Sequence, residues 1–442
     1  MFWAFFCAKL RFFLHTCKNY CIFAHFLGTS MRWSKEAKDT IWLIGLQGIN
    51  YLAPLLVWPY LMMVLGAEQF GVFSFGIAFA QYLMILVDFG FNLTATKQIA
   101  LAKGNAAETN RLFSATLVAK IILLLLSGII ALVVSLLPMY AAYRTIVWIT
   151  WLMVVGNTFS LLWLFQGAGK IRLATIINSV LKLLILPFTF VCVKTSADIY
   201  IAAWIQVAVF ISTAITMIVL TRVLKLAKLT TIRWIDIKEQ FLNSWSIFLS
   251  NAATSTYTAL FVVILAYFVS ADEVGRYAAV EKIMRCACYL IWIPISQAYF
   301  PRVSRLSAEN REEGKRLVRI LTIVVIIVLG AAGLFLAFGV EPLTAWLGKD
   351  YTGIGNIAVV MAAVPMMIGL GGVQGQMRLI AMGEEKEKIA FRNIYIIAGA
   401  LSLICVLPLS YFWGAIGAAA ALVITEGFVC IAMCTCRRRK QK

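Results

Sequence analysis

The sequence predicts an all-α integral membrane protein, with twelve transmembrane helices in two parallel-repeat lobes of six helices each. Three observations predict this fold class. Of the 442 residues, 62% are hydrophobic and 13% are charged, whereas soluble domains carry about 25% charged residues. Apolar segments long enough to cross a hydrocarbon core of about 30 Å recur along the chain. Basic residues gather on alternate connections between these segments, as expected of short cytoplasmic loops.

The first forty residues precede the apolar segments. Residues 1–30 contain three bases, both histidines and no acid. Their apolar runs are too short to span a bilayer, and they lack the continuous apolar core of a signal peptide. We interpret residues 1–30 as a dispensable extension or an upstream start, with an interfacial anchor as the alternative. Residues 31–40 form a cytoplasmic lead-in to the first span.

Twelve predicted spans follow the lead-in. Their approximate bounds are 41–64, 70–91, 112–137, 145–166, 171–193, 198–221, 241–269, 276–299, 317–340, 354–377, 389–412 and 414–434. The stretch 47–100 holds the first two spans, which meet at a polar elbow expected on the outer side. We expect this hairpin to form the framework of its lobe, bent at Pro54 and Pro59.

The distribution of bases predicts the topology. One set of alternate connections holds most of the 39 bases, and the other holds only Arg144, Lys194, Arg276 and Lys349. Because Lys and Arg in short loops stay in the cytoplasm, we expect both termini, including the basic tail 435–442, to be cytoplasmic. We therefore attribute the formal charge of +19 to bases in cytoplasmic loops, which set the orientation of the spans. The sequence has no basic stripe interleaved with aromatic residues, so we do not expect it to bind nucleic acid.

A basic link at mid-chain divides the predicted spans. Residues 222–240 form a long cytoplasmic connection with five bases, between lobes at 41–221 and 241–434. The elbow Ala67–Phe73 aligns with Ala271–Tyr277, and both follow the first span of their half. Six spans per half return the chain to the same side, so the halves are expected to be parallel repeats. Coincidence over seven positions is the alternative.

Charged residues inside the spans are the candidate functional residues, since each costs about 2.5 to 3.5 kcal/mol at a helix centre. Unpaired bases favour a hydrated cavity that binds an anionic head group, such as a diphosphate. The predicted substrate-binding residues are Lys120, Lys182, Arg285 and Lys282, and the candidate ion-coupling residues are Glu281, Glu426 and Asp88. Snorkelling or an internal ion pair, for example Lys182 with Glu426, is the alternative. For Lys282 and Asp88, nearer an interface, that alternative is favoured.

Helix breakers and aromatic residues also fall within the spans. The prolines that predict bends are Pro54, Pro59, Pro187, Pro294, Pro365 and Pro408, and four glycines follow Pro365. They suit a transporter whose halves rock, although static packing explains them equally well. Trp and Tyr near span ends, such as Trp58 and Tyr60, are interpreted as an interfacial belt.

Several absences limit the function. No outer connection exceeds roughly fifteen residues, and the spans contain no Walker loop, histidine or catalytic carboxylate pair. The cysteines inside the spans have no histidine partners at zinc spacing, since both histidines lie within residues 1–30. The sequence therefore predicts no enzyme, no catalytic residue, no cofactor and no metal site.

Three blocks of sequence resemble a known family. Residues 52–100, the segment WLFQG at 163–167 and residues 273–306 are similar to the O-antigen and exopolysaccharide flippases. These belong to the multidrug, oligosaccharidyl-lipid and polysaccharide exporter superfamily. The resemblance implies a two-lobed transporter that moves an undecaprenyl-diphosphate-linked oligosaccharide across the bacterial inner membrane by alternating access. It also implies a cationic central cavity, contact with membrane lipids and, as a further partner, the polysaccharide polymerase machinery.

Two other functions stay open at this stage. A small-molecule multidrug or cation antiporter of the same superfamily would prefer an acidic cavity for cationic drugs, whereas the bases inside these spans equal or exceed the acids. A membrane-embedded glycan polymerase would need catalytic groups in a sizeable loop, and the short outer connections speak against it.

Overall fold

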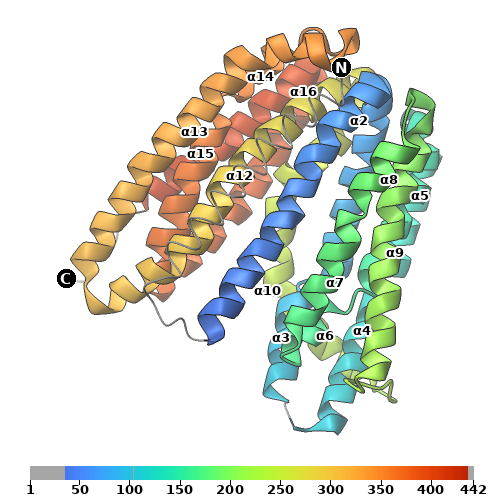
Figure 1. Ribbon diagram of the computed structural model, residues 1–442, viewed down its shortest axis with the longest axis vertical. Coiled ribbons are helices and arrows are strands. Elements are labelled where there is room, and N and C mark those ends of the chain that lie inside the picture. The colour runs from blue at the N-terminus through green and yellow to red at the C-terminus, as the bar shows by residue number, and fades with distance from the viewer. Residues whose placement is uncertain (1–34, 103, 437–442) are drawn as a thin grey trace. The chain divides into compact units, whose positions relative to one another are not determined.

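The structure is a computed structural model that describes residues 35–102 and 104–436 (Figure 1). The predicted extension at 1–30 and most of the basic tail at 435–442 lie outside the described residues. Within the described ranges the chain forms helices and no strand. Residues 49–442 make up one compact unit, to which the contacts below belong. The all-α prediction is confirmed.

The N-terminal half contains ten helical elements among the described residues. They are α2 (Lys35–Asp88), α3 (Phe91–Leu101), α4 (Ala106–Leu136), η1 (Pro138–Tyr143), α5 (Arg144–Thr158), α6 (Leu162–Gly167), α7 (Ile171–Leu183), α8 (Ile185–Cys192) and α9 (Ile199–Val223), with the short turn η2 (Ser196–Asp198) before α9. Asn105 caps α4, since its side chain accepts the Glu108 N–H at 3.1 Å. The left-handed residues Phe89 and Gly90 separate α2 from α3.

The C-terminal half begins after an irregular linker. Its elements are α10 (Trp234–Thr258), α11 (Leu260–Phe268), α12 (Ala271–Glu309), α13 (Arg311–Leu347), η3 (Lys349–Tyr351), α14 (Ile354–Met361), α15 (Val364–Gly372), the π-helix η4 (Val373–Ala381) and α16 (Glu385–Thr435). Helices end shortly before Pro187 and Pro365, while Pro294 and Pro408 lie inside continuous helices. A proline thus coincides with a helix break at some of the predicted bends.

Among the described residues, eight helices are long and apolar enough to cross a membrane, or nine if the bent pair α10 and α11 is one span. Two of these helices are longer than one span requires. α2 departs from helical geometry at Gly66 and α16 at Gly414, so each provides two segments of spanning length. Helix α12 is not among these spans, and the count would reach twelve only with α12 assigned as a further span, so the number twelve stays a prediction.

The break in α2 lies at the predicted elbow between the first two spans. The non-helical residue within α2 is Gly66, with φ 72° and ψ 172°, and the bends expected at Pro54 and Pro59 stay predictions. This left-handed φ suits glycine, which has no Cβ. The chain therefore reverses at the predicted polar elbow itself.

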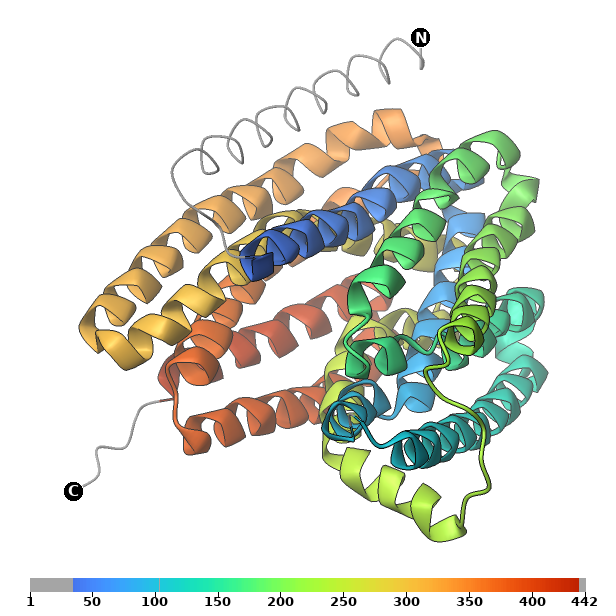
Figure 2. The ribbon, with the colours of Figure 1, turned by 60° about the horizontal axis from the view of Figure 1, so that its bottom comes forward.

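Helices of each half pack mainly with one another (Figures 1 and 2). In the N-terminal half α9 contacts α5, α7 and α8, and α4 contacts α3 and α5. In the C-terminal half α12, α13, α15 and α16 pack together. α10 contacts both sets, since it packs on α16 and also on α3 and α4. Helix α10 thus bridges the two halves.

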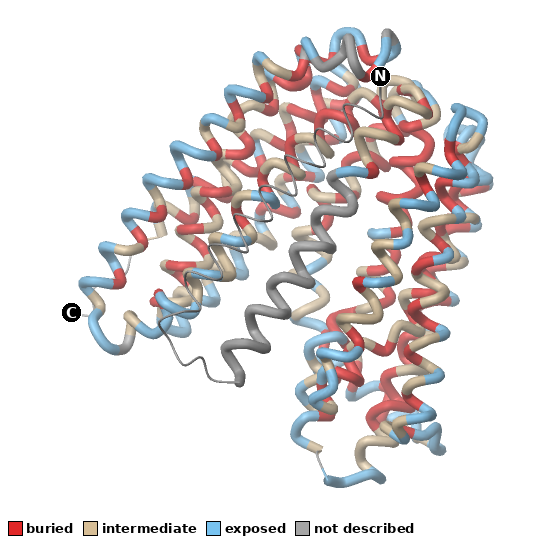
Figure 3. The backbone as a smooth tube through the Cα atoms, viewed as in Figure 1, coloured by how far each residue is buried: buried red, intermediate tan, exposed pale blue. Residues whose placement is uncertain are grey.

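Apolar side chains cover the outer faces of several helices, where Figure 3 shows exposed residues alternating with buried ones. On α13 the exposed apolar residues include Ile320, Ile323, Val324, Ile327, Leu334 and Phe338. Their spacing of three and four residues marks one helical face. A soluble protein would not expose such a stripe, so this face is in contact with lipid.

The two halves meet closely where α2 and α12 cross. A Cβ at Gly71 would lie 1.9 Å from the Ala271 carbonyl oxygen, and a Cβ at Gly275 would lie 1.8 Å from that of Ala67. These residues correspond in the predicted repeat, and the contact is reciprocal, as across a twofold axis. Only glycine at both positions permits this approach of the backbones.

We predict that Gly71→Ala or Gly275→Ala lowers the apparent Tm of the purified protein by several degrees. Each methyl group would overlap a carbonyl oxygen and force the two helices apart, and overpacking of this kind costs about 1 to 3 kcal/mol or more. Thermal unfolding in detergent measures the effect. Gly330→Ala in α13 is the control, because its methyl group would meet no atom within 4 Å. Equal Tm values for all three variants would contradict the tight crossing.

Candidate functional site

A buried polar centre lies in the N-terminal half. Lys120 on α4 is fully buried, and its Nζ lies 2.9 Å from Oδ1 of Asp88 at the end of α2. Asn157 on α5 donates its side-chain N–H to the same Asp88 oxygen at 3.1 Å. The structure thus brings together a predicted substrate-binding base and a predicted ion-coupling acid. Lys120 offsets both the Asp88 charge and the negative end of the helix that carries it.

A second polar centre lies in the C-terminal half. Arg285 and Glu281 of α12 are buried and form an ion pair with Nε to Oε1 at 2.9 Å. The pair is the i,i+4 neighbour contact expected from their spacing. Arg285 also donates from Nη2 to the carbonyl oxygen of Tyr257 at 3.4 Å. This carbonyl belongs to the last turn of α10, next to the 47° bend into α11. The guanidinium therefore links the eighth span to the bend of the seventh.

Glu426 of α16 faces the same centre. It is buried, and it interacts electrostatically with Arg285, Tyr257 and Tyr395. No Lys or Arg nitrogen among the described residues lies within 4 Å of it. The structure therefore places three predicted residues, Glu281, Arg285 and Glu426, in one cluster, in which only the first two are directly paired.

Lys282 connects the two halves. Its Nζ lies 4.9 Å from the ring centroid of Trp58 on α2, within the range of a cation–π contact. The Trp58 ring also contacts Phe70 and Phe73. The half-buried ring of Trp58 thus packs partly against other side chains of the protein, and its interpretation as an interfacial belt residue stays a prediction. A neighbouring belt residue, Tyr60, likewise donates to the Val193 carbonyl at 2.6 Å.

Lys182 is set apart from these centres. It lies in the last turn of α7 and is half-buried. No carboxylate among the described residues lies within 4 Å of its Nζ, so the pairing with Glu426 considered from the sequence is absent there. Of the four predicted bases, Lys120 and Arg285 are thus ion-paired, while Lys182 and Lys282 have no carboxylate in direct contact within the described ranges.

Sequence reasoning missed a further ionic cluster on the predicted cytoplasmic side. Arg111 of α4 contacts Glu108 at 2.7 Å and Asp236 of α10 at 2.5 Å. The Arg233 backbone N–H, at 2.9 Å, and the Arg111 guanidinium hold the pKa of Asp236 below its usual 3.8. This cluster, together with a Thr94–Ser244 hydroxyl contact of 2.6 Å, ties α10 to the N-terminal half. Its residues lie outside the apolar spans, so a search for charges within spans could not find them.

The polar partners Asn157 and Tyr257 were missed for another reason. Both residues lie within predicted spans, but neither is charged, and only charged residues within spans were predicted to be functional. Asn157 could have been identified from the sequence, since an amide in an apolar span needs a hydrogen-bond partner. The carbonyl of Tyr257 could not, because its availability depends on the bend after α10.

Comparison with known proteins identifies the family. A family model described as "Polysaccharide biosynthesis protein" matches residues 37–307, more than half of the chain. The chain belongs to this family. The resemblance predicted from its three sequence blocks is confirmed.

Full-length relatives extend the match. The chain is 33% identical over 395 residues to a protein from Escherichia coli (strain K12) described as "Putative O-antigen transporter", covering 89% of this chain and 94% of that protein. A Shigella dysenteriae protein of the same description is 32% identical over 400 residues, covering 90% and 98%. This member of the polysaccharide biosynthesis protein family is therefore a multi-pass membrane transport protein rather than an enzyme.

Solved structures share the fold. The lipid II flippase MurJ in an inward closed conformation superposes with a TM-score of 0.72 at 12% identity, covering 89% of this chain and 86% of that one. An inward-facing multidrug resistance MATE family transporter of the MOP superfamily gives a TM-score of 0.63 at 12% identity, covering 87% and 92%. At these identities the likeness concerns the fold alone.

We predict that Asp88→Asn lowers the apparent Tm more than Lys120→Met does. Asp88→Asn leaves a fully buried ammonium without its carboxylate, and such a loss costs about 3 to 5 kcal/mol. Lys120→Met leaves the Asp88 side chain, which is 25% exposed and keeps Asn157 as donor. The double variant should recover much of the stability. Equal Tm losses in the two single variants would contradict the asymmetry.

The ionic cluster of Arg111, Glu108 and Asp236 predicts a pH dependence. Because the pKa of Asp236 is lower in the folded protein than the usual 3.8, its contribution to stability is complete above that value and is lost as the pH falls through the folded pKa. The Tm difference between wild type and Asp236→Asn should therefore be constant from about pH 8 to 5, begin to shrink near pH 4 and disappear only below the folded pKa of Asp236.

Glu309→Gln is the matched control for this measurement. Glu309 pairs with Arg305 on the surface at 3.8 Å, and both side chains are more than 60% exposed. Exposed pairs contribute little to stability, so this variant should resemble wild type at every pH. A Tm difference for Asp236→Asn that grows on acidification would contradict the assignment.

Proposed function

We propose that the protein is a flippase for an undecaprenyl-diphosphate-linked oligosaccharide, an O-antigen or exopolysaccharide repeat unit. In this proposal it carries the substrate from the cytoplasmic to the outer leaflet of the inner membrane by alternating access. The observation that carries the proposal is the match of about a third of residues to O-antigen transporter relatives over nearly the whole of both chains. The fold shared with a lipid II flippase supports it.

The proposed substrate contacts are the bases inside the spans. Lys282 and Lys182 are the first contacts for the diphosphate, because neither has a carboxylate in direct contact within the described ranges. A phosphate charge about 5 Å from one ammonium gains about 3 kcal/mol at an effective dielectric constant of 20. Lys120 and Arg285 bind only as the anion displaces Asp88 and Glu281 from 2.9 Å contacts. The isoprenoid tail stays in lipid.

Glu281, Glu426 and Asp88 are the proposed ion-coupling groups. Glu426 is the strongest of them, since it is buried without a direct basic partner among the described residues. A buried carboxylate of this kind binds a proton or cation more readily than one already paired. Uptake of a proton or cation by Glu426 would also change the electrostatic field at Arg285. Ion binding would in this way be connected to the substrate contacts.

The proposed orientation follows the basic residues. Both termini and the linker between the halves face the cytoplasm, and the α2–α12 crossing lies toward the outer side. The substrate is then loaded from the side that carries Arg111 and Asp236. Polysaccharide polymerase machinery acting on the outer leaflet is the proposed next partner of the exported repeat.

We predict that Lys282→Met reduces glycan export about tenfold, equivalent to about 1.4 kcal/mol of lost binding, while Lys282→Arg retains most of it. Arginine keeps the positive charge and the contact with the Trp58 ring, whereas methionine keeps only the length of the side chain. Surface glycan is quantified in a deletion strain that expresses each variant. Lipid-linked repeat units should accumulate as export falls.

The other bases complete the test. Lys120→Ala, Lys182→Ala and Arg285→Ala should each reduce export, and Lys388→Met serves as control because it is an exposed surface base paired with Glu385. If variants at all four site positions export glycan as well as wild type does, the proposed basic substrate site is wrong. Failure of the wild-type protein itself to restore glycan or clear the lipid-linked repeat would remove the flippase proposal.

A further inference from the structure

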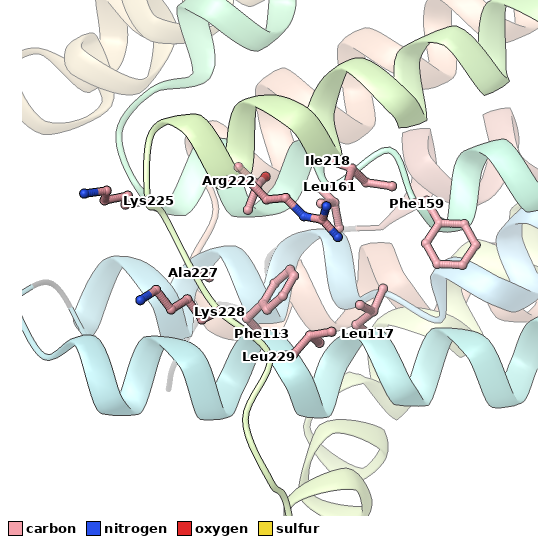
Figure 4. Close-up of a pocket in the computed structure, with 11 residues that line it drawn as sticks. Phe113, Leu117, Phe159, Leu161, Ile218, Arg222, Lys225, Ala227, Lys228 and Leu229 are labelled. Carbon is pink, nitrogen blue, oxygen red and sulfur yellow. The ribbon is translucent and has the colours of Figure 1, made fainter.

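A separate cavity opens on the predicted cytoplasmic side of the N-terminal half. Its volume is about 510 Å³, and it lies between α4, the α5–α6 connection, α9 and the linker that follows α9. Figure 4 shows its lining side chains. None of them belongs to the polar centres around Lys120 or Arg285, so the cavity is no part of the site proposed above.

The cavity combines an apolar floor with a basic rim. Phe113, Leu117, Phe159, Leu161 and Ile218 form most of the floor. The rim carries Arg222, Lys225 and Lys228, and the lining contains no acidic residue. In Figure 4 the guanidinium of Arg222 reaches over the apolar side chains, while the two lysines project from the linker at the edge.

The three rim bases have no acidic partner. Among the residues that the structure describes, no carboxylate oxygen lies within 4 Å of Arg222, Lys225 or Lys228. All three are exposed. Surface bases elsewhere, such as Lys315 and Lys388, pair with nearby acids. The rim therefore presents three positive charges that only an external anion can balance.

The linker is fixed over the cavity. The Lys228 backbone N–H donates to the Asn110 side chain at 2.7 Å, and that of Thr230 donates to the Ser114 hydroxyl at 2.9 Å. The Leu226 N–H bonds to the Thr221 carbonyl at 3.0 Å, and Lys225 has a left-handed φ of 50°. This is the helix-ending geometry in which glycine is usual. A lysine there keeps a charge at the rim at some conformational cost.

The position of the cavity matches the membrane interface. α9 has 25 residues, about 37 Å in length at 1.5 Å per residue, and Arg222 lies in its last turn. The rim is therefore at head-group level, and the floor reaches into the hydrocarbon. Exposed Val223 and Leu229 beside the rim continue the apolar surface. A soluble anion would neutralise the rim and leave the floor empty, whereas a lipid fills both.

We propose that this cavity binds an anionic phospholipid of the cytoplasmic leaflet. The phosphate lies among Arg222, Lys225 and Lys228, and the upper acyl chains lie against Phe113, Leu117 and Ile218. Basic pockets between helices on the cytoplasmic side are the usual sites for such head groups. The lipid would occupy the space between the linker and α4, and so support the connection between the two halves.

The test compares lipids on the purified full-length protein. Native mass spectrometry counts bound phosphatidylglycerol and phosphatidylcholine of identical acyl chains. Wild type should retain phosphatidylglycerol in preference. Loss of one rim base should weaken the binding of phosphatidylglycerol about fivefold. The triple variant Arg222→Gln/Lys225→Gln/Lys228→Gln should weaken it about a hundredfold, and phosphatidylcholine binding should change little.

The control removes three exposed bases elsewhere, as Arg302→Gln/Arg316→Gln/Arg319→Gln, and should bind phosphatidylglycerol like wild type. Leu117→Trp fills the floor without changing the charge and should also reduce binding. Unchanged apparent Tm values establish that the variants fold. Equal binding by the rim triple variant and the control would overturn the proposal.

Two competitors distinguish other sources of phosphate. Millimolar inorganic phosphate should leave the bound phosphatidylglycerol in place; full displacement would indicate a site for free phosphate and overturn the lipid assignment. Undecaprenyl phosphate should compete no better than phosphatidylglycerol. Stronger competition, lost in the rim triple variant, would assign the cavity to the carrier lipid and overturn the phospholipid proposal.

Discussion

The crossing of α2 and α12 at Gly71 and Gly275 constrains the rest of the structure. Each glycine faces a carbonyl oxygen of the opposite helix, so the backbones touch with no side chain between them. The Tyr351 hydroxyl donates to the Met62 carbonyl at 3.1 Å close to the same end of the molecule. Trp58, which Lys282 contacts, also packs against Phe70 and Phe73 on either side of Gly71. Any change in the arrangement of the halves must preserve this contact or break it.

Much of the fold could be predicted from the sequence because a bilayer requires long apolar helices. The alignment of the elbows Ala67–Phe73 and Ala271–Tyr277 also indicated the two segments that meet at the reciprocal crossing. The reversal of the first hairpin was predictable too, since Gly66 lies at the predicted polar elbow and glycine suits its positive φ. Prolines are weaker signals, because helices in membranes tolerate residues such as Pro408.

The candidate site was predictable only where contacts are local. Glu281 and Arg285 are four residues apart on one helix, and the structure pairs them as that spacing indicates. The pairing of Lys120 with Asp88 joins two helices, and nothing in the spacing along the chain specifies it. The same holds for Arg111 and Asp236, which are 125 residues apart. Tertiary packing decides these partners, so the sequence supplied the charges and not their pairing.

The pairing changes how the site can recognise an anion. A buried ion pair already balances its own charge, so an approaching diphosphate gains from Lys120 or Arg285 only what remains after Asp88 or Glu281 is released. Lys282, held by a neutral ring, pays no such penalty. Under the proposed function, anion binding at the paired bases would therefore free a carboxylate within the membrane, where it requires a proton or cation. The proposed substrate binding and the proposed ion uptake are thus linked by the same two salt bridges.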